Sequence, residues 1–298
     1  MIKSTIQYST SRNFSLITTF MFMWVAINFS PQLADVFGYV LILSVGILHG
    51  SNDLILINKA MSDKKLKMTL VLMVYLLVIL TAAVLFYKWP LMALTSFVLF
   101  SAYHFGEQHW ANRVKGNAWA VRFFFFCYGM AILLLLFFCN FEDTSAVIFD
   151  IAKYSLPQNT FLNGLVFFGV ISIALGSYLV HSDYVRKKST EELFYLLLFF
   201  LLFKAASLIW GFAVYFVLWH AIPSLNDQIK YLHGELNIKT VLSYVRESLL
   251  NWLVALLGLT LMYFVFKNDD SVFITIFFSF LAAITFPHVL VISNIYKQ

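Results

Sequence analysis

Apolar runs long enough to cross a bilayer follow one another along almost the whole chain. They lie near 14–30, 37–57, 67–87, 89–110, 119–139, 161–181, 191–206, 208–225, 248–266 and 272–295. A hydrocarbon core about 30 Å thick needs roughly 20 residues of α-helix. The runs therefore predict an all-α fold, a polytopic transmembrane helical bundle of about ten helices. A bundle of eight or nine spans is also possible, because only Lys204, Ser207 and Gly211 interrupt the apolar stretch 191–225.

Composition leaves little material for anything outside the membrane. Hydrophobic residues make up 61% of the chain and charged residues only 12%, with a mean hydropathy of +0.83. No internal repeat, low-complexity tract or Gly/Ser linker divides the chain. We expect residues 1–298 to form a single integral membrane domain, and the first run to be a signal anchor rather than a cleaved signal peptide.

The net charge of +5 follows a membrane pattern. If the N-terminus lies inside, most Lys and Arg residues fall in inner segments, and acidic residues such as Asp35, Glu142 and Asp150 fall in outer ones. This distribution obeys the positive-inside rule. It predicts a multi-pass protein of the inner, cytoplasmic membrane with both termini cytoplasmic, and it gives no reason to expect a nucleic-acid partner.

Histidines within the apolar runs are the strongest candidates for a functional site, because polar groups are costly to place in a membrane. His49, His104, His220 and His288 lie on four runs that all go from outside to inside, each about five to eight residues before the inner end at about 1.5 Å per residue. This common depth predicts a cluster. His109 is a further candidate, whereas His181 and His233 are expected at interfacial or loop positions.

Residues near these histidines fit a crowded site. Asp53 follows His49 by four residues and Glu107 follows His104 by three, so each carboxylate shares a helical face with a histidine. Either carboxylate could ligate a metal, but we favour the role of accepting a hydrogen bond from a ligand's second ring nitrogen. Gly46 and Gly50 form a small-residue face that would let another helix approach.

Several imidazole rings that meet in a dry cavity are most simply explained as ligands of one shared cation. The two cysteines, Cys127 and Cys139, lie within one apolar run and form no metal-type pair. A nitrogen-rich site suits non-haem iron or zinc, and the residues alone do not separate these two metals. Pro223 lies three residues after His220, and Pro287 lies directly before His288. Each proline removes a backbone hydrogen-bond donor from its helix. A kink that shapes the site and an ordinary membrane-helix proline are equally good interpretations of both.

At these motifs the chain resembles the Brp/Blh family of membrane proteins, whose characterised members cleave β-carotene to retinal. The resemblance rests on the segment from His49 to Asp53, on His104-Phe-Gly106, on Trp219-His220 and on Pro287-His288. It implies an Fe(2+)-dependent, non-haem β-carotene 15,15'-dioxygenase with His49, His104 and His220 as iron ligands. Family members carry a further ligand histidine where this chain has Ser224, so His288 or His109 is expected to complete the site.

The expected reaction is cleavage of the central double bond of a carotenoid by O2. The product retinal suggests a functional link to a retinal-binding opsin, and membrane lipid is the expected surroundings. Three alternatives stay open: a membrane di-iron hydroxylase or desaturase acting on a lipid, a non-catalytic carotenoid-binding or opsin-assembly protein, and a metal or proton transporter. The di-iron enzymes use tight HxxxH or HxxHH boxes, which this chain lacks.

Overall fold

The computed structural model describes the backbone of residues 2–60, 68–111, 113–114, 116–179, 183–266 and 270–295. These residues form helices joined by short connections, and no strand occurs among them. The α-helices are α1 (Ile2–Asn28), α2 (Pro31–Leu41), α3 (Asp53–Ala60), α4 (Met68–Lys88), α5 (Pro90–Trp110), α6 (Ala118–Cys139), α7 (Phe141–Ala152), α8 (Gln158–Tyr178), α9 (Asp183–Ala205), α10 (Leu208–Tyr215), α11 (Ile222–His233), α12 (Ile238–Phe266) and α13 (Asp270–Ile295). Two π-helical turns, η1 (Ile42–Gly46) and η3 (Phe216–Ala221), extend α2 and α10.

The all-α prediction is confirmed, but the expected count of ten helices is wrong. The run at 37–57 is divided between α2, η1 and α3, and the run at 208–225 between α10, η3 and α11. The short helix α7 was not predicted, because it mixes apolar residues with Glu142, Asp143 and Asp150. The weakly separated stretch 191–225 contains two helices, since Ser207 caps α10 by accepting a hydrogen bond from the Trp210 amide.

Six helical segments in the described part of the chain are long and apolar enough to cross a membrane. They are α4, α6, α8, the continuous run Leu208–His233, α12 and α13. In α4, α8 and α12 only 11% of the most apolar window is buried, so these helices present apolar side chains outward, as lipid contact requires. Segments α6, Leu208–His233 and α13 are mostly buried and form the interior.

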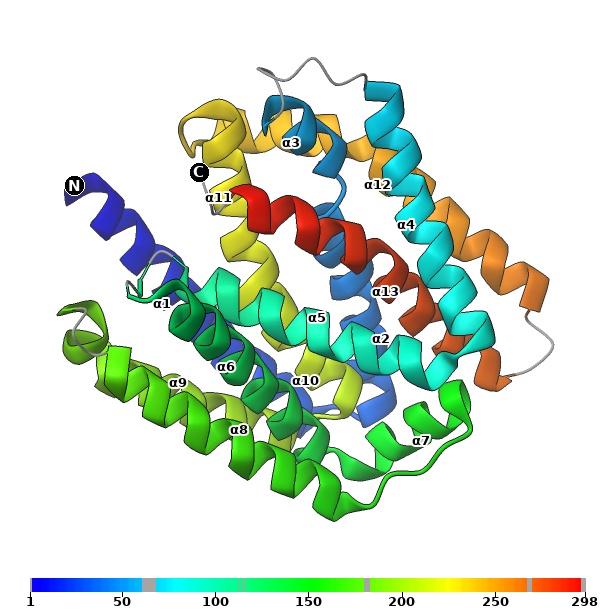
Figure 1. Ribbon diagram of the computed structural model, residues 1–298, viewed down its shortest axis with the longest axis horizontal. Helices are drawn as coiled ribbons and strands as arrows, with labels where there is room; N and C mark the ends of the chain where they lie inside the picture. The colour runs from blue at the N-terminus through cyan, green and yellow to red at the C-terminus, as the bar shows by residue number, and fades with distance from the viewer. Residues whose placement is uncertain are drawn as a thin grey trace.

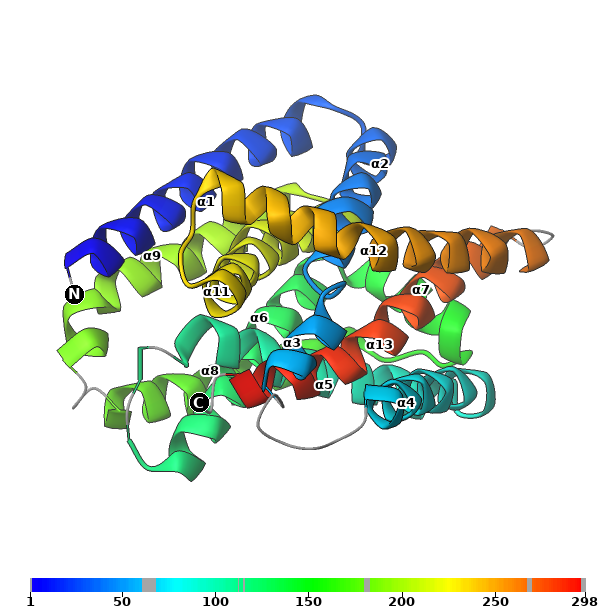
Figure 2. The same ribbon diagram turned by 90° about the horizontal axis from the view of Figure 1, so that it is seen from above.

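The interior places the candidate site where several helices cross. Figure 1 shows the α10–η3–α11 segment in yellow and α13 in red passing through the middle of the molecule. Helix α2 packs against α10, η1 against η3, and α13 against α4 and α5. Figure 2 shows α12 lying across one face and α1 beside α9 at the other end.

Glycines allow the closest helix crossing, between α5 and α6. A Cβ atom on Gly106 would lie 1.9 Å from the Phe125 carbonyl oxygen, and one on Gly129 would lie 1.8 Å from the Ala102 carbonyl oxygen. Only glycine leaves room for two backbones at this separation. The crossing fixes the rotation of α5 and hence the direction of His104, two residues before Gly106.

Candidate metal centre

Four buried histidines from four separate segments converge on one point. His49 follows η1, His104 lies on α5, His220 lies in η3 and His288 lies on α13. Their ring centroids form a closed circuit, with His49 to His288 at 4.7 Å, His288 to His104 at 5.2 Å, His104 to His220 at 4.6 Å and His220 to His49 at 5.3 Å. Each side chain is at most 6% exposed, so the rings meet in a water-poor interior.

Three of the four histidines place ring nitrogens close enough together to share one metal ion, and the fourth, His220, packs against the rings of His49 and His104. One nitrogen from each of His49, His104 and His288 lies within 4.8 Å of the others. Nε2 of His49, His220 and His288 and both ring nitrogens of His104 are buried without a hydrogen-bond partner. Two nitrogens on opposite sides of one ion lie about 4 Å apart, because each bond is about 2.0–2.1 Å long. Three buried histidines of the cluster could therefore hold a metal ion with little movement.

Two of the rings are oriented by hydrogen bonds on their other nitrogen. Nδ1 of His288 donates to Oδ1 of Asp53 at 2.7 Å, and Nδ1 of His49 donates to the Gly46 carbonyl. Because carboxylate and carbonyl oxygens only accept, each bond fixes the tautomer and leaves the Nε2 lone pair available to a metal ion. Oδ2 of Asp53 in turn accepts a hydrogen bond from Tyr75 at 3.2 Å.

The histidine that Asp53 contacts is His288 on α13, and not His49 on its own run. Glu107 has a different environment: it accepts hydrogen bonds from Tyr103 at 2.9 Å and from Ser293. These contacts tie α5 to α13. The predicted sharing of a face between Glu107 and His104 does not bring the carboxylate to the imidazole ring.

Ser224 lies one turn beyond His220 and belongs to a buried polar network beneath His49. Its hydroxyl accepts a hydrogen bond from Nε2 of Gln228 at 3.1 Å, and the same amide nitrogen donates to the His49 carbonyl at 2.9 Å. Tyr244 donates to Oε1 of Gln228 at 2.7 Å. Ser224 thus helps to hold the backbone of a cluster histidine.

His109 points to a different cluster. Its Nε2 lies 2.9 Å from Oε2 of Glu192, whose other oxygen pairs with Nη2 of Arg12 at 2.6 Å. Arg113 joins them at 3.6 Å. These side chains connect α1, α5 and α9, and among the contacts of the described residues none joins His109 to the four histidines of the cluster. His233 ends α11 beside Glu247, and His181 lies outside the described residues.

The π-helical turns explain how two of the histidines reach the cluster. His220 lies within η3, and His49 follows η1 in the turn before α3. A π-turn adds a residue to a helical turn and changes the direction of every side chain after it, and such turns are frequent at functional sites. Pro223 follows η3 and has no N–H to donate, and the nearby Leu218 carbonyl accepts a hydrogen bond from Ser15 instead.

The two glycines beside His49 have separate neighbours. A Cβ atom on Gly46 would lie 2.7 Å from the ring of Phe216, so a larger residue would have to displace this ring at the contact between η1 and η3. Gly50 faces His288, whose Nδ1 would be 3.6 Å from an added Cβ. The predicted close approach at Gly46 is confirmed.

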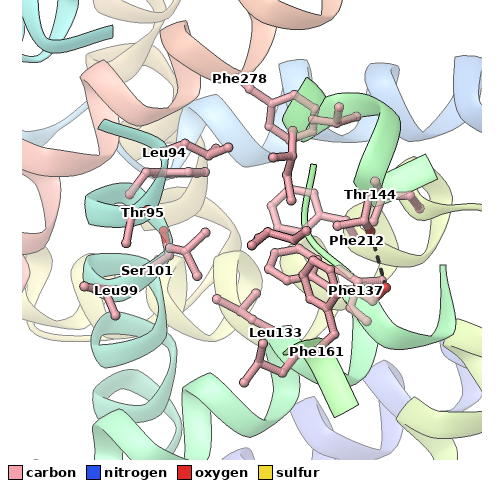
Figure 3. A pocket seen from close by; sticks show the side chains of 18 of the residues that line it. Leu94, Thr95, Leu99, Ser101, Leu133, Phe137, Thr144, Phe161, Phe212 and Phe278 are labelled. Atoms are coloured by element: carbon pink, nitrogen blue, oxygen red, sulfur yellow. Dashed lines mark hydrogen bonds between the residues drawn. The ribbon is translucent and has the colours of Figure 1, made fainter. Parts of the chain in front are cut away.

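An apolar cavity of about 330 Å³ begins next to the cluster. Phe105 lines this cavity, and its ring centroid is 4.6 Å from that of His220. Phe212, which also lines the cavity, stacks on Phe216, and Phe216 stacks on His220, with interplanar angles of 7° and 17°. Figure 3 shows Phe137, Phe161 and Phe212 facing Leu94, Thr95 and Ser101 of α5.

Sequence reasoning missed Gln228, Tyr244, Tyr75 and Phe105. A signal existed for Gln228, which lies eight residues after His220 and four after Ser224, on one helical face. Tyr244, Tyr75 and the special position of Phe105 depend on contacts between helices that are distant in the sequence, and no local pattern marks them.

A family model for beta-carotene 15,15'-dioxygenase matches residues 40–296, which include all four histidines of the cluster. The chain belongs to this family. The resemblance seen in the histidine motifs is thereby confirmed over most of the chain. A dioxygenase family with a carotenoid substrate agrees with a buried metal-type cluster beside an apolar cavity. No curated protein and no solved structure gives a significant match.

Proposed function

We propose that this protein is an iron-dependent dioxygenase that cleaves the central 15,15' double bond of β-carotene to give two molecules of retinal. The observation that carries the proposal is the circuit of four histidines, each with a buried ring nitrogen that lacks a hydrogen-bond partner, in a chain of the beta-carotene 15,15'-dioxygenase family. His49, His104, His220 and His288 would hold the iron.

The choice of His288 follows from the departure at Ser224. The family histidine expected there would come from α11, whereas Ser224 is engaged with Gln228. His288 comes from α13 and supplies a buried, unpartnered Nε2 to the same cluster. It therefore replaces the missing ligand from another helix, and His109, which faces Glu192, is not part of the proposed ligand set.

The overall reaction needs no reductant other than the substrate. The central carbon–carbon double bond breaks, and each of its two carbons gains one oxygen atom from O2 as an aldehyde. Ferrous iron bound by the histidines would supply the activation of O2. The remaining requirements, which are positioning of the polyene and exclusion of water, are met by the chain itself.

Protein groups hold the site ready for this reaction. Asp53 and the Gly46 carbonyl fix the tautomers of His288 and His49, so neither ring must turn to present Nε2. Phe105, Phe212 and Phe216 provide flat apolar surfaces along which a conjugated chain can lie.

The topology proposed from the charge distribution places both termini in the cytoplasm and the histidines nearer the inner side of the cytoplasmic membrane. Membrane lipid would then deliver the carotenoid, and retinal would pass to a retinal-binding opsin. Residues 1–298 would act as one integral membrane domain.

The test is expression in bacteria that accumulate β-carotene, followed by chromatographic analysis of the extract. We expect retinal from the wild type and a loss of at least a hundredfold in His49→Ala and His220→Ala. His233→Ala is the matched control, because that histidine lies away from the cluster beside Glu247, and it should form retinal at the wild-type level. Unchanged β-carotene in membranes that contain well-expressed wild type would refute the proposal and favour a non-catalytic carotenoid-binding protein.

A further inference from the structure

One side chain, that of Phe105, belongs both to the lining of the apolar cavity and to the surroundings of the four-histidine cluster. Phe105 lines the cavity and also contacts the rings of His220 and Phe216, with centroid distances of 4.6 Å and 6.1 Å. It is 5% exposed, so its ring is held between these groups. Phe105 therefore bridges the cavity and the histidines by direct contact.

The lining of the cavity defines the chemistry of its occupant. None of the described residues that line it is charged, and its polar side chains are the hydroxyl groups of Thr95, Ser101, Thr144 and Thr160. Such a surface favours a hydrocarbon over a lipid headgroup or a charged metabolite. Leu91 and Leu99, which line the cavity, are 39% and 41% exposed, so the cavity reaches the exposed surface of α5.

The length of the cavity can be measured along α5. Its lining residues on this helix run from Leu91 to Phe105, a distance of about 21 Å at about 1.5 Å per residue. A carotenoid is roughly as long as the hydrocarbon core, about 30 Å, so half of it is about 15 Å long. The part of α5 that lines the cavity is therefore longer than half a carotenoid and shorter than the whole molecule.

We propose that this cavity holds one half of the carotenoid, ring end included, and that Phe105 is the specificity-determining residue that presents the central double bond to the four-histidine cluster. The proposal rests on the proposed function. With one ring inside the cavity, the middle of the polyene reaches Phe105, and the other half continues beyond the histidines. Rotation of the Phe105 ring opens this path, and the bulk of the ring limits how far the polyene can slide.

The binding test uses purified protein and measures bound β-carotene by its absorbance, together with the iron content. Ser101 lies one helical turn before Phe105 and lines the cavity, so Ser101→Phe fills the space beside it. We expect at least a tenfold loss of bound β-carotene with unchanged iron. Leu99→Trp narrows the exposed mouth without disturbing the core, and it should lower binding at least fivefold even if Ser101→Phe does not fold. Met92→Phe is the control, because Met92 is 61% exposed on another face of α5.

The selectivity test compares products of Phe105→Leu and wild type by chromatography. A smaller side chain should let the polyene slide, so aldehydes from off-centre cleavage should rise at least fivefold relative to retinal, while Phe105→Tyr should retain the wild-type pattern. Cleavage by the wild type with unaltered binding in both cavity variants, or unaltered products from Phe105→Leu, would overturn this inference alone. A wild type that binds and cleaves no carotenoid would overturn the proposed function as well.

Discussion

Asp53 accepts a hydrogen bond of 2.7 Å from Nδ1 of His288, although the two residues are 235 positions apart in the sequence. The bond joins α3 to α13 inside the protein, where both side chains are at most 5% exposed. Tyr75 on α4 donates to the second oxygen of Asp53. One carboxylate thus orients a cluster histidine and ties together three helices.

Replacement of Asp53 by Asn should weaken iron binding. The amide keeps the size of the side chain but removes the charge that strengthens the bond to His288, and loss of such a partner costs about 10–100-fold in metal affinity. Affinity can be measured by competition with a chelator. Glu142→Gln, an exposed change on α7, is the control and should bind iron as the wild type does. Equal affinity of Asp53→Asn and wild type would show that Asp53 does not orient a ligand.

His288→Ala should lower the iron content, whereas His109→Ala should lower the stability and leave the iron content unchanged. The first removes a cluster nitrogen, and we expect iron content after dialysis to fall at least tenfold. The second leaves Glu192 with one partner fewer, which should lower the free energy of unfolding by about 1–3 kcal/mol with iron content within twofold of the wild type. Elemental analysis and thermal denaturation in detergent give the two readouts. Loss of iron in His109→Ala would indicate that His109 is an iron ligand after all.

The wild type should contain one iron ion per chain after reconstitution under anaerobic conditions. A single circuit of four histidines offers nitrogen ligands for one ion, and Glu107 is engaged with Tyr103 and Ser293. Elemental analysis against protein concentration measures the ratio, and removal by a chelator should abolish retinal formation until iron is restored. Two ions per chain would instead favour a di-iron hydroxylase or desaturase.

Gln228→Leu should destabilise the backbone beneath His49. The change removes the donor to the His49 carbonyl and the acceptor for Tyr244, and buried groups without partners cost about 1–3 kcal/mol. We expect the free energy of unfolding to fall by this amount and iron affinity to fall with it. Thr260→Val, which removes an exposed hydroxyl contact on α12, should change neither quantity. A stable Gln228→Leu protein with normal iron affinity would argue against this network as a support for His49.

Gly106→Ala and Gly129→Ala should be strongly destabilising, because each new Cβ would lie within 2 Å of a carbonyl oxygen on the facing helix. Overpacking costs about 1–3 kcal/mol or more, and here the obstructing atom belongs to the backbone. Thermal denaturation in detergent should show a lower midpoint for both variants. Gly169→Ala meets no atom within 4 Å and should be neutral or stabilising by up to about 1 kcal/mol. Similar midpoints for all three variants would mean that the backbones of α5 and α6 lie farther apart than in this structure.

The sequence by itself determined the helical fold, because a long apolar run in a membrane must satisfy its backbone hydrogen bonds within a helix. It also singled out His49, His104, His220 and His288, since polar groups at one depth are costly unless they serve a common purpose. The sequence predicted the ends of the helices less accurately than their apolar parts. Helices α1, α9 and α12 continue for several residues into polar segments, because hydropathy marks the apolar part of a helix and not its full length.

Only the tertiary structure decided which groups face one another. The partners of Asp53 and His109 are His288 and Glu192, each on a distant helix, although spacing along the chain had paired Asp53 with His49 and had left His109 a candidate ligand. Side-chain direction depends on how each helix is rotated and crossed. That rotation is set by long-range packing, such as the contact of Gly106 with Phe125 and of Gly46 with Phe216, and by the π-turns, which local periodicity does not encode.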